Sequence, residues 1–204
     1  MDRKLIKNQA KELINVDYWM FVGVYAVYTA IISALSGSYG VALLILGGPI
    51  TVGFISYILK LKRNNNAKFV DLFSGFQSFG KYLVTFLLVT LFTFLWTLLF
   101  IIPGIIKGLS YSQALYLIYD NPNMSPKEAI KKSQEMMNGH KKELFILELS
   151  FIGWHLLGII TLGIVEIFYV GPYYNSALAI YYENLKPAES NDNSNTETVE
   201  GTIE

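Results

Sequence analysis

Residues 82–119 read YLVTFLLVTLFTFLWTLLFIIPGIIKGLSYSQALYLIY and carry a single charged side chain, Lys107. An α-helix needs about 20 apolar residues to cross the hydrocarbon core of a bilayer, so this run is long enough for two crossings. Pro103 and Gly104 lie near its middle, and proline removes a backbone donor while glycine weakens a helix. The stretch therefore predicts two membrane-spanning helices, 82–102 and 104–119, joined by a turn at Pro103-Gly104.

The rest of the chain contains three further long apolar runs, 19–37, 39–61 and 144–182. The last run is too long for one crossing and is interrupted at Thr161-Leu162-Gly163. The composition, 52% hydrophobic and 15% aromatic, is that of a membrane protein rather than a soluble domain. We predict an all-α polytopic membrane protein with six spans arranged as three hairpins, at 19–36, 40–61, 82–102, 104–119, 143–160 and 163–182.

Basic residues are concentrated between the hairpins. Positive charge in short loops marks the cytoplasmic side, so we expect every basic segment and both termini to be cytoplasmic. The uncharged turns after residues 36, 102 and 160 then face outward. These basic residues are Arg3, Lys4, Lys7 and Lys11; Lys60, Lys62, Arg63, Lys68 and Lys81; Lys127, Lys131, Lys132, Lys141 and Lys142; and Lys186.

The first apolar run could also be interpreted as a cleaved signal peptide, because a basic segment precedes it. The run is longer than an ordinary signal core, and no A-x-A cleavage pattern follows it. We therefore expect a retained transmembrane helix.

Each predicted hairpin is preceded by a polar stretch whose apolar residues recur at helical spacing. The third stretch begins with Ser125-Pro126-Lys127-Glu128, a capping box with proline at the first helical position, and Gly139 suits its end. Amphipathic helices beside membrane spans most simply lie in the inner interface, so we predict three cytoplasmic interfacial helices. Their apolar residues are Leu5, Ile6, Ala10, Leu13 and Ile14; Phe69, Leu72, Phe73, Phe76 and Phe79; and Ala129, Ile130, Met136 and Met137.

We assign residues 1–185 to one membrane domain. Residues 186–204 are rich in Asn, Ser, Thr and Glu and contain no aromatic side chain. Such a segment cannot bury enough apolar surface to offset its chain entropy, so we predict a disordered acidic cytoplasmic tail.

Four ionisable side chains fall within the predicted spans: Lys107, Glu148, His155 and Glu166. Charged groups are expensive in lipid, so each is a candidate functional residue. Lys107 and Glu166 lie near the outer turns, where an ion pair or snorkelling would also satisfy them. Glu148 and His155 are seven residues apart and share a helix face. We define a candidate polar cluster as Lys107, Ser110, Tyr111, Glu148 and His155.

Two interpretations of this cluster remain open. In the first, Glu148 and His155 relay protons or hold a cation. In the second, they form hydrogen bonds across helices to polar groups such as Ser110, Tyr111 or Asn175. One histidine and one carboxylate are too few for a metal site, and His140 is predicted at the cytoplasmic surface. With no cysteine in the chain, a thiol nucleophile and a thiolate metal site are excluded.

Motifs for common enzymatic chemistry are missing. Residues 75–81 fit the start of a phosphate-binding P-loop, but Tyr82 stands where a Mg²⁺-binding Ser or Thr is required and no strand precedes it. There is no G-x-S-x-G and no H-E-x-x-H. We therefore predict no catalytic residue, metal or cofactor.

The second half of the chain contains a series of short motifs: IIPGIIK (101–107), LSYS (109–112), DNP (120–122), AIKKS (129–133), GHK (139–141), ELF (143–145), LSFIGW (149–154) and TLGI (161–164). With these motifs the chain resembles, over nearly its whole length to Leu185, the bacterial membrane family called domain of unknown function 975. The resemblance implies a plasma-membrane protein, mostly from Gram-positive bacteria, with no established activity. Glu148, His155 and Glu166 depart from its motif residues, whereas the family pattern includes Pro103, Gly104, Lys107, Ser110, Tyr111, His140, Glu143, Ser150 and Trp154.

These observations favour a non-enzymatic membrane module that organises lipid or a partner protein, which is either another membrane protein or a second copy of this chain. The alternative is a small transporter or channel with a polar cavity around the candidate cluster. A membrane-embedded lipid enzyme is a third hypothesis, for which only Glu148 and His155 would supply acid–base chemistry. We expect membrane lipids and no nucleic acid among the partners.

Overall fold

The computed structural model describes residues 2–37, 40–64 and 66–186, and all of the regular secondary structure in these ranges is helical. This confirms the predicted all-α class for the described residues. The predicted tail lies outside them from residue 187 onward. The elements are α1 (Arg3–Val16), α2 (Tyr18–Ser36), α3 (Val41–Asn64), the 3₁₀ helix η1 (Phe69–Ser78), α4 (Phe79–Leu99), α5 (Ile101–Tyr111), α6 (Ala114–Asp120), α7 (Pro126–Met136), α8 (Lys141–Leu149), α9 (Ile152–Ile160), the π-helix η2 (Glu166–Val170) and α10 (Gly171–Leu185).

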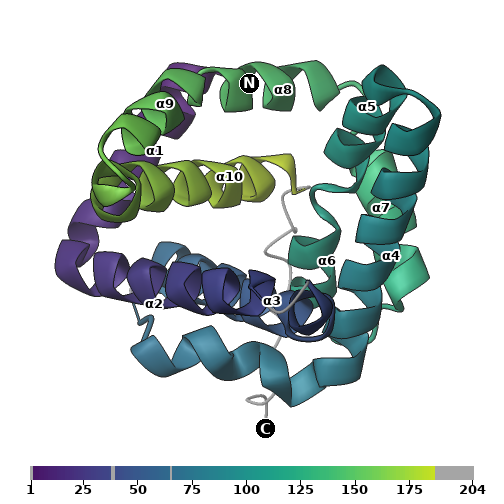
Figure 1. Ribbon diagram of the computed structural model, residues 1–204, viewed down its shortest axis with the longest axis horizontal. Coiled ribbons are helices and arrows are strands. Elements are labelled where there is room, and N and C mark those ends of the chain that lie inside the picture. The colour runs from purple at the N-terminus through teal and green to yellow at the C-terminus, as the bar shows by residue number, and fades with distance from the viewer. Residues whose placement is uncertain (1, 38–39, 65, 187–204) are drawn as a thin grey trace, which may run out of the picture.

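Helix α10 lies in the middle of the molecule, with the other helices around it (Figure 1). It contacts α1, α2, α3 and η2. Its buried side chains are mostly small or aromatic, among them Ala177, Ala179, Tyr181 and Tyr182, and they form part of the hydrophobic core. This helix was predicted as the second half of the sixth span, and the structure makes it the centre of the protein core.

Five helical segments are long and apolar enough to cross a membrane: 18–36, 41–64, 69–99, 101–120 and 141–160. The sixth predicted span, 163–182, is not among them; the chain forms η2 and α10 there. A membrane protein with several apolar helices is therefore supported, while the count of six is not confirmed.

The turn between α4 and α5 lies slightly earlier than predicted. Phe100 has extended backbone angles, φ −157° and ψ 135°, and ends α4. Pro103 instead lies in the first turn of α5, where its missing N–H has no intrahelical partner in any case. A Cβ at Gly104 would overlap Thr97, so this glycine lets α5 pack closely on α4.

Two predicted spans are broken by turns. The span 104–119 bends at Ser112–Gln113 between α5 and α6, and 143–160 bends at Ser150–Phe151 between α8 and α9. Side chains far away in sequence stabilise both turns: Ser133 Oγ accepts from the backbone N–H of Gln113, and Lys7 Nζ donates to the carbonyl oxygen of Ser150. The apolar pattern carries no signal for either break.

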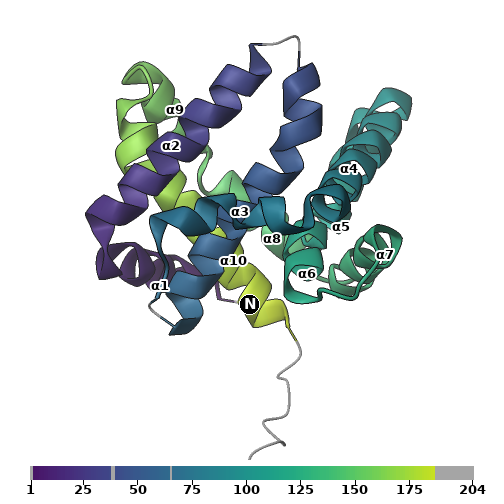
Figure 2. The ribbon, with the colours of Figure 1, turned by 90° about the horizontal axis from the view of Figure 1, so that it is seen from below.

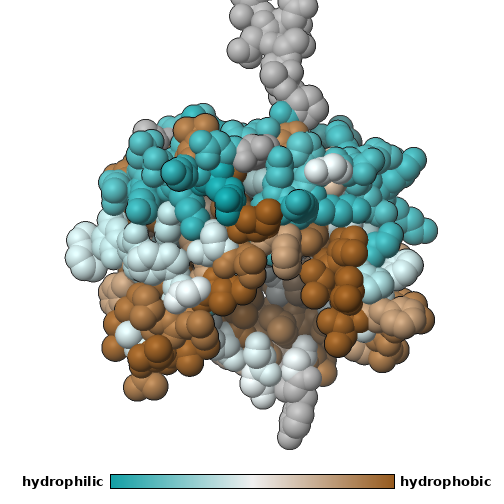
Figure 3. Space-filling view, turned by 90° about the horizontal axis from the view of Figure 1, so that it is seen from above, coloured by the Kyte–Doolittle hydropathy of each residue, from teal (hydrophilic) through white to brown (hydrophobic). Residues whose placement is uncertain are grey.

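The surface is divided into a polar half and an apolar half (Figure 3). The α4–α5 and α9–η2 turns are apolar, and Leu162, which adopts a left-handed φ of 52°, is 93% exposed there. Figure 2 shows the C-terminal end of α2 and the N-terminal end of α3 at the opposite end of the molecule from α1 and the C-terminal end of α10. The exposed apolar side chains at the two described turns include Leu98, Leu99, Phe100, Ile101, Ile102, Ile159, Ile160, Leu162 and Ile164.

The three predicted interfacial stretches behave differently from one another. In α1 the apolar face, Ile6, Ala10, Leu13 and Ile14, is buried in the core against α10 rather than left free for lipid. In α7, Ala129 and Ile130 are buried against α4, α5 and α6. Leu5, the remaining residue of the predicted α1 face, is 53% exposed, and η1 leaves Phe69, Phe73 and Phe76 exposed. Most of the apolar residues predicted to face lipid in α1 and α7 therefore pack against protein instead.

Candidate functional site

A network of charged side chains joins the ends of three helices on the polar half of the molecule. Arg63 at the end of α3 makes two hydrogen bonds of 2.8 Å to the carboxylate of Asp120 at the end of α6. It also pairs with Glu183 of α10, at 2.5 Å. From α10, Tyr182 Oη and Lys186 Nζ donate to Asp120 Oδ2 at 2.7 and 2.9 Å. The side chain of Asp120 is only 6% exposed, so these donors compensate a nearly buried negative charge.

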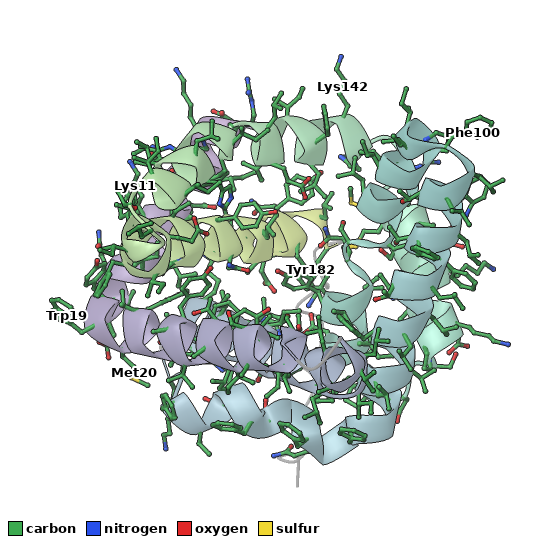
Figure 4. The ribbon with its side chains drawn as sticks, in the orientation of Figure 1. Lys11, Trp19, Met20, Phe100, Lys142 and Tyr182 are labelled. Atoms are coloured by element: carbon green, nitrogen blue, oxygen red, sulfur yellow. The ribbon has the colours of Figure 1, made fainter. Side chains whose placement is uncertain are left out.

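A cavity of about 490 Å³ lies beside this network. Its volume is within the range of small-molecule sites. Figure 4 shows Tyr182, one of its lining residues, at the end of α10 near the centre of the molecule. The cavity is lined by Leu117, Asp120 and Asn121 from the end of α6, Lys132, Glu135 and Met136 from α7, His140, and Tyr182, Leu185 and Lys186 from α10.

A second, smaller cavity of about 260 Å³ lies between η1, α3, α4 and α6. Lys60 and Asp71 form an ion pair of 2.6 Å in its wall, and Ser56 donates a hydrogen bond to Tyr119 there. Asp71 also accepts from the backbone N–H of Lys68, which fixes the start of η1. The remaining lining residues are Val70, Phe73, Ser74, Gln77 and Tyr82.

The residues of the candidate polar cluster do not line either cavity. Lys107 Nζ lies 4.9 Å from the ring centroid of Trp96, on the neighbouring helix α4. Ser110 donates to the carbonyl oxygen of Ile106, and its own carbonyl accepts from Ser133. Tyr111 packs between α4 and α7 with Leu88 and Ile130. These three residues therefore contribute to helix packing.

The other two members of the cluster, Glu148 and His155, lie on separate helices because the chain turns between α8 and α9. His155 Nδ1 is 3.1 Å from Glu166 Oε2, and its ring lies against Tyr174. Glu148 makes no hydrogen bond or ion pair with any residue that the structure describes. The ionisable pair in this part of the molecule is thus His155–Glu166, neither a Glu148–His155 pair nor the Lys107–Glu166 pair that the outer turns had suggested.

Residues 98–189 match the family model described as "Protein of unknown function (DUF975)". Over this segment the chain is similar to the DUF975 family. The match confirms the resemblance noted in the sequence for residues 98–189, and not for nearly the whole chain. No curated protein and no solved structure matches the chain.

The DUF975 motifs contribute four residues to the larger cavity. Asp120 and Asn121 belong to DNP, Lys132 to AIKKS and His140 to GHK. His140 Nδ1 is 3.0 Å from Glu143 Oε2, another motif residue, and Tyr181 Oη donates to the carbonyl oxygen of His140. The cavity is therefore the place where motifs separated in sequence meet.

The remaining motif residues have packing roles. Ser150 donates to Leu147 within α8, and its carbonyl accepts from Lys7 of α1. Lys7 also lies over the ring of Phe151; partial burial and the nearby charges of Arg3 and Lys11 lower its pKa. Trp154 packs against Tyr169 of η2. These contacts hold the α8–α9 turn against the N-terminal helix.

Sequence reasoning missed Arg63 and Glu183 as members of the site. Each lies at the end of an apolar run, where a charged residue is most simply interpreted as membrane-flanking. Arg63 is 57 residues from Asp120 and 120 residues from Glu183 in sequence, so no local spacing predicts either pairing. The available signal was Asp120 itself, an acidic residue that directly follows the predicted span 104–119, where most of the residues flanking the spans are basic.

Proposed function

We propose that this protein is a non-enzymatic module of the bacterial plasma membrane that organises lipid, with both termini cytoplasmic and without a cofactor. The proposal rests above all on η1, which holds a strip of exposed apolar side chains. Val70 is 65% exposed, and Phe73 and Phe76 are each about 40% exposed. Large exposed apolar patches mark binding surfaces for protein or membrane.

The geometry of η1 explains why this strip stays exposed. A 3₁₀ helix has three residues per turn, so Val70, Phe73 and Phe76 share one side. Leu72 and Gly75 lie on another side and are buried. A Cβ at Gly53 of α3 would overlap the carbonyl of Leu72, and one at Gly75 would overlap the carbonyl of Pro49. Backbone therefore lies directly on backbone, and the phenylalanines cannot turn inward.

The location of η1 supports lipid rather than a soluble protein as the partner. In Figure 2, η1 crosses the molecule between the end that holds α1 and the end where α2 finishes and α3 begins. Lys68 precedes the strip, and Lys60 is paired with Asp71 beside it. Aromatic side chains next to lysines suit the boundary between acyl chains and headgroups, where aromatic rings are enriched and lysines meet anionic lipid.

The transporter hypothesis gains no support from the geometry. Lys107, Tyr111, Glu148 and His155 were expected around one polar cavity, but neither cavity described above includes any of them. We therefore retain the lipid-organising module as the proposed function.

The test is to count motionally restricted lipids around the protein with spin-labelled phosphatidylglycerol and phosphatidylcholine in reconstituted vesicles. We expect wild-type protein to restrict phosphatidylglycerol preferentially. Phe73→Ala combined with Phe76→Ala should abolish that preference without unfolding the helices. Phe94→Ala combined with Phe100→Ala, which removes two still more exposed rings outside η1, should keep it. Equal preference in both double variants would contradict the proposal.

A further inference from the structure

We infer that the 490 Å³ cavity between α6, α7 and α10 is a binding site for a small organic anion from the cytoplasm, with a phosphate or carboxylate group and an apolar substituent. The inference concerns a site separate from η1 and does not depend on the lipid proposal. It follows from the charges that remain unpaired at the cavity and from the side chains that form its walls.

Most charges at the cavity are already matched. Asp120 is bonded to Arg63, Lys186 and Tyr182, and Arg63 also holds Glu183. Two cations and two carboxylates therefore balance within this network. The carboxylate of Asp120 has little remaining capacity to accept a donor from a ligand, so a cationic ligand is disfavoured at this wall.

The donors that remain available are positive or neutral. Lys132 lines the cavity and makes no hydrogen bond or ion pair with any described residue. His140 uses Nδ1 on Glu143, which leaves Nε2 as its free ring nitrogen. Lys186 spends one of its three ammonium hydrogens on Asp120. Three nitrogen groups from three separate segments thus surround one cavity, an arrangement that suits the oxygens of a phosphate or carboxylate.

An apolar wall completes the site. Leu117, Met136, Tyr182 and Leu185 line the cavity next to these donors, and Leu117 and Tyr182 are nearly inaccessible to solvent. Ligand sites typically combine such a wall with a few polar groups that fix orientation. The wall therefore selects an anion that carries a hydrocarbon or aromatic group over a bare inorganic ion.

Glu135 is the one carboxylate at the cavity outside the balanced network. Its nearest basic partner is Lys131, at 3.9 Å, and its side chain is 64% exposed. The negative charge of Glu135 repels an anion, and the surrounding solvent screens part of this repulsion. Removing the charge of Lys132 should therefore weaken the binding of an anion, and removing the charge of Glu135 should strengthen it.

The experiment is calorimetric titration of phenyl phosphate into the full-length protein in lipid nanodiscs, with empty nanodiscs subtracted. We expect saturable binding, tighter than that of inorganic phosphate. Lys132→Gln should weaken it about five- to tenfold, because it removes a charge-assisted hydrogen bond. Glu135→Gln should strengthen it about twofold. Lys127→Gln, an exposed lysine of the same helix that does not line the cavity, should leave it unchanged.

Three results would overturn the inference. Equal affinity of Lys132→Gln and Lys127→Gln would show that the cavity is not the binding site. Equal affinity for phenyl phosphate and inorganic phosphate would remove the role of the apolar wall. Binding in lipid-free detergent but not in nanodiscs would show that a membrane phospholipid occupies the cavity, in place of a water-soluble anion.

Discussion

Arg63 and Asp120 form a bidentate ion pair, with Nη1 2.8 Å from Oδ1 and Nη2 2.8 Å from Oδ2. The planar guanidinium matches the carboxylate in this geometry, which lysine cannot reproduce. The pair connects the end of α3 to the end of α6, and Tyr182 and Lys186 add the end of α10. Three helices distant in sequence are thereby fixed together on the polar half.

Replacing Asp120 with asparagine should lower the free energy of unfolding by about 2–4 kcal/mol, because Arg63 and Lys186 lose the carboxylate that balances them. The measurement is reversible unfolding in detergent micelles. Glu183→Gln is the matched control, since Glu183 is more exposed and bonds only Arg63 in this network; we expect a loss of about 1 kcal/mol or less. Equal losses in the two variants would show that burial of Asp120 is not decisive.

Gly53→Ala should destabilise the protein by at least about 2 kcal/mol, because the new methyl group would overlap the carbonyl of Leu72 and push η1 away from α3. Gly23→Ala is the control: it lies within α2 and its Cβ would meet no atom within 4 Å. Alanine favours a helix over glycine by up to about 1 kcal/mol, so this control should be neutral or stabilising. Thermal unfolding of both variants in nanodiscs tests the difference.

The His155–Glu166 pair should show energetic coupling in a double-mutant cycle. We expect His155→Ala and Glu166→Ala together to cost about 1 kcal/mol less than the sum of the two single changes, because each single change leaves the other polar group unpaired. Unfolding free energies of the four proteins give the coupling. The same cycle on Glu148 and His155 should give none, since the structure does not pair them.

The orientation can be tested with introduced cysteines, because the chain has none of its own. Asn138→Cys, at the end of α7, should react with a membrane-impermeant maleimide only in inside-out vesicles. Ser36→Cys, at the end of α2, should react only in intact cells, since we expect that turn to face outward. Reaction of both from one side would refute the odd number of crossings expected between them, at 40–61, 82–102 and 104–119.

The sequence was most informative where local chemistry decides the structure. The capping box at the start of α7 is present, with Glu128 accepting from Ser125 N–H and Ser125 Oγ from Glu128 N–H. Gly139 has the left-handed φ, 84°, expected after a helix end. The apolar runs and their interruptions located five helices able to cross a membrane. These features depend on residues a few positions apart.

The missed features depend on residues far apart. The break after α5 is stabilised by Ser133, 20 residues away from Gln113, and the amphipathic faces of α1 and α7 meet protein where sequence alone suggested lipid. In 69–78 the apolar spacing fits an α-helix as well as a 3₁₀ helix. η1 packs closely on α3 because Gly53 and Gly75 each contact the backbone of the other helix. The sequence does not show this contact, because it forms only when the two helices lie together.

That backbone contact makes η1 and the middle of α3 one rigid body. A change in the tilt of α3 therefore carries the phenylalanine strip with it, without a hinge to absorb the motion. At its other end, α3 holds Asp120 and Glu183 through Arg63. Through Arg63 of the same helix, the phenylalanine strip of η1 is thus connected to α6 and α10 beside the 490 Å³ cavity.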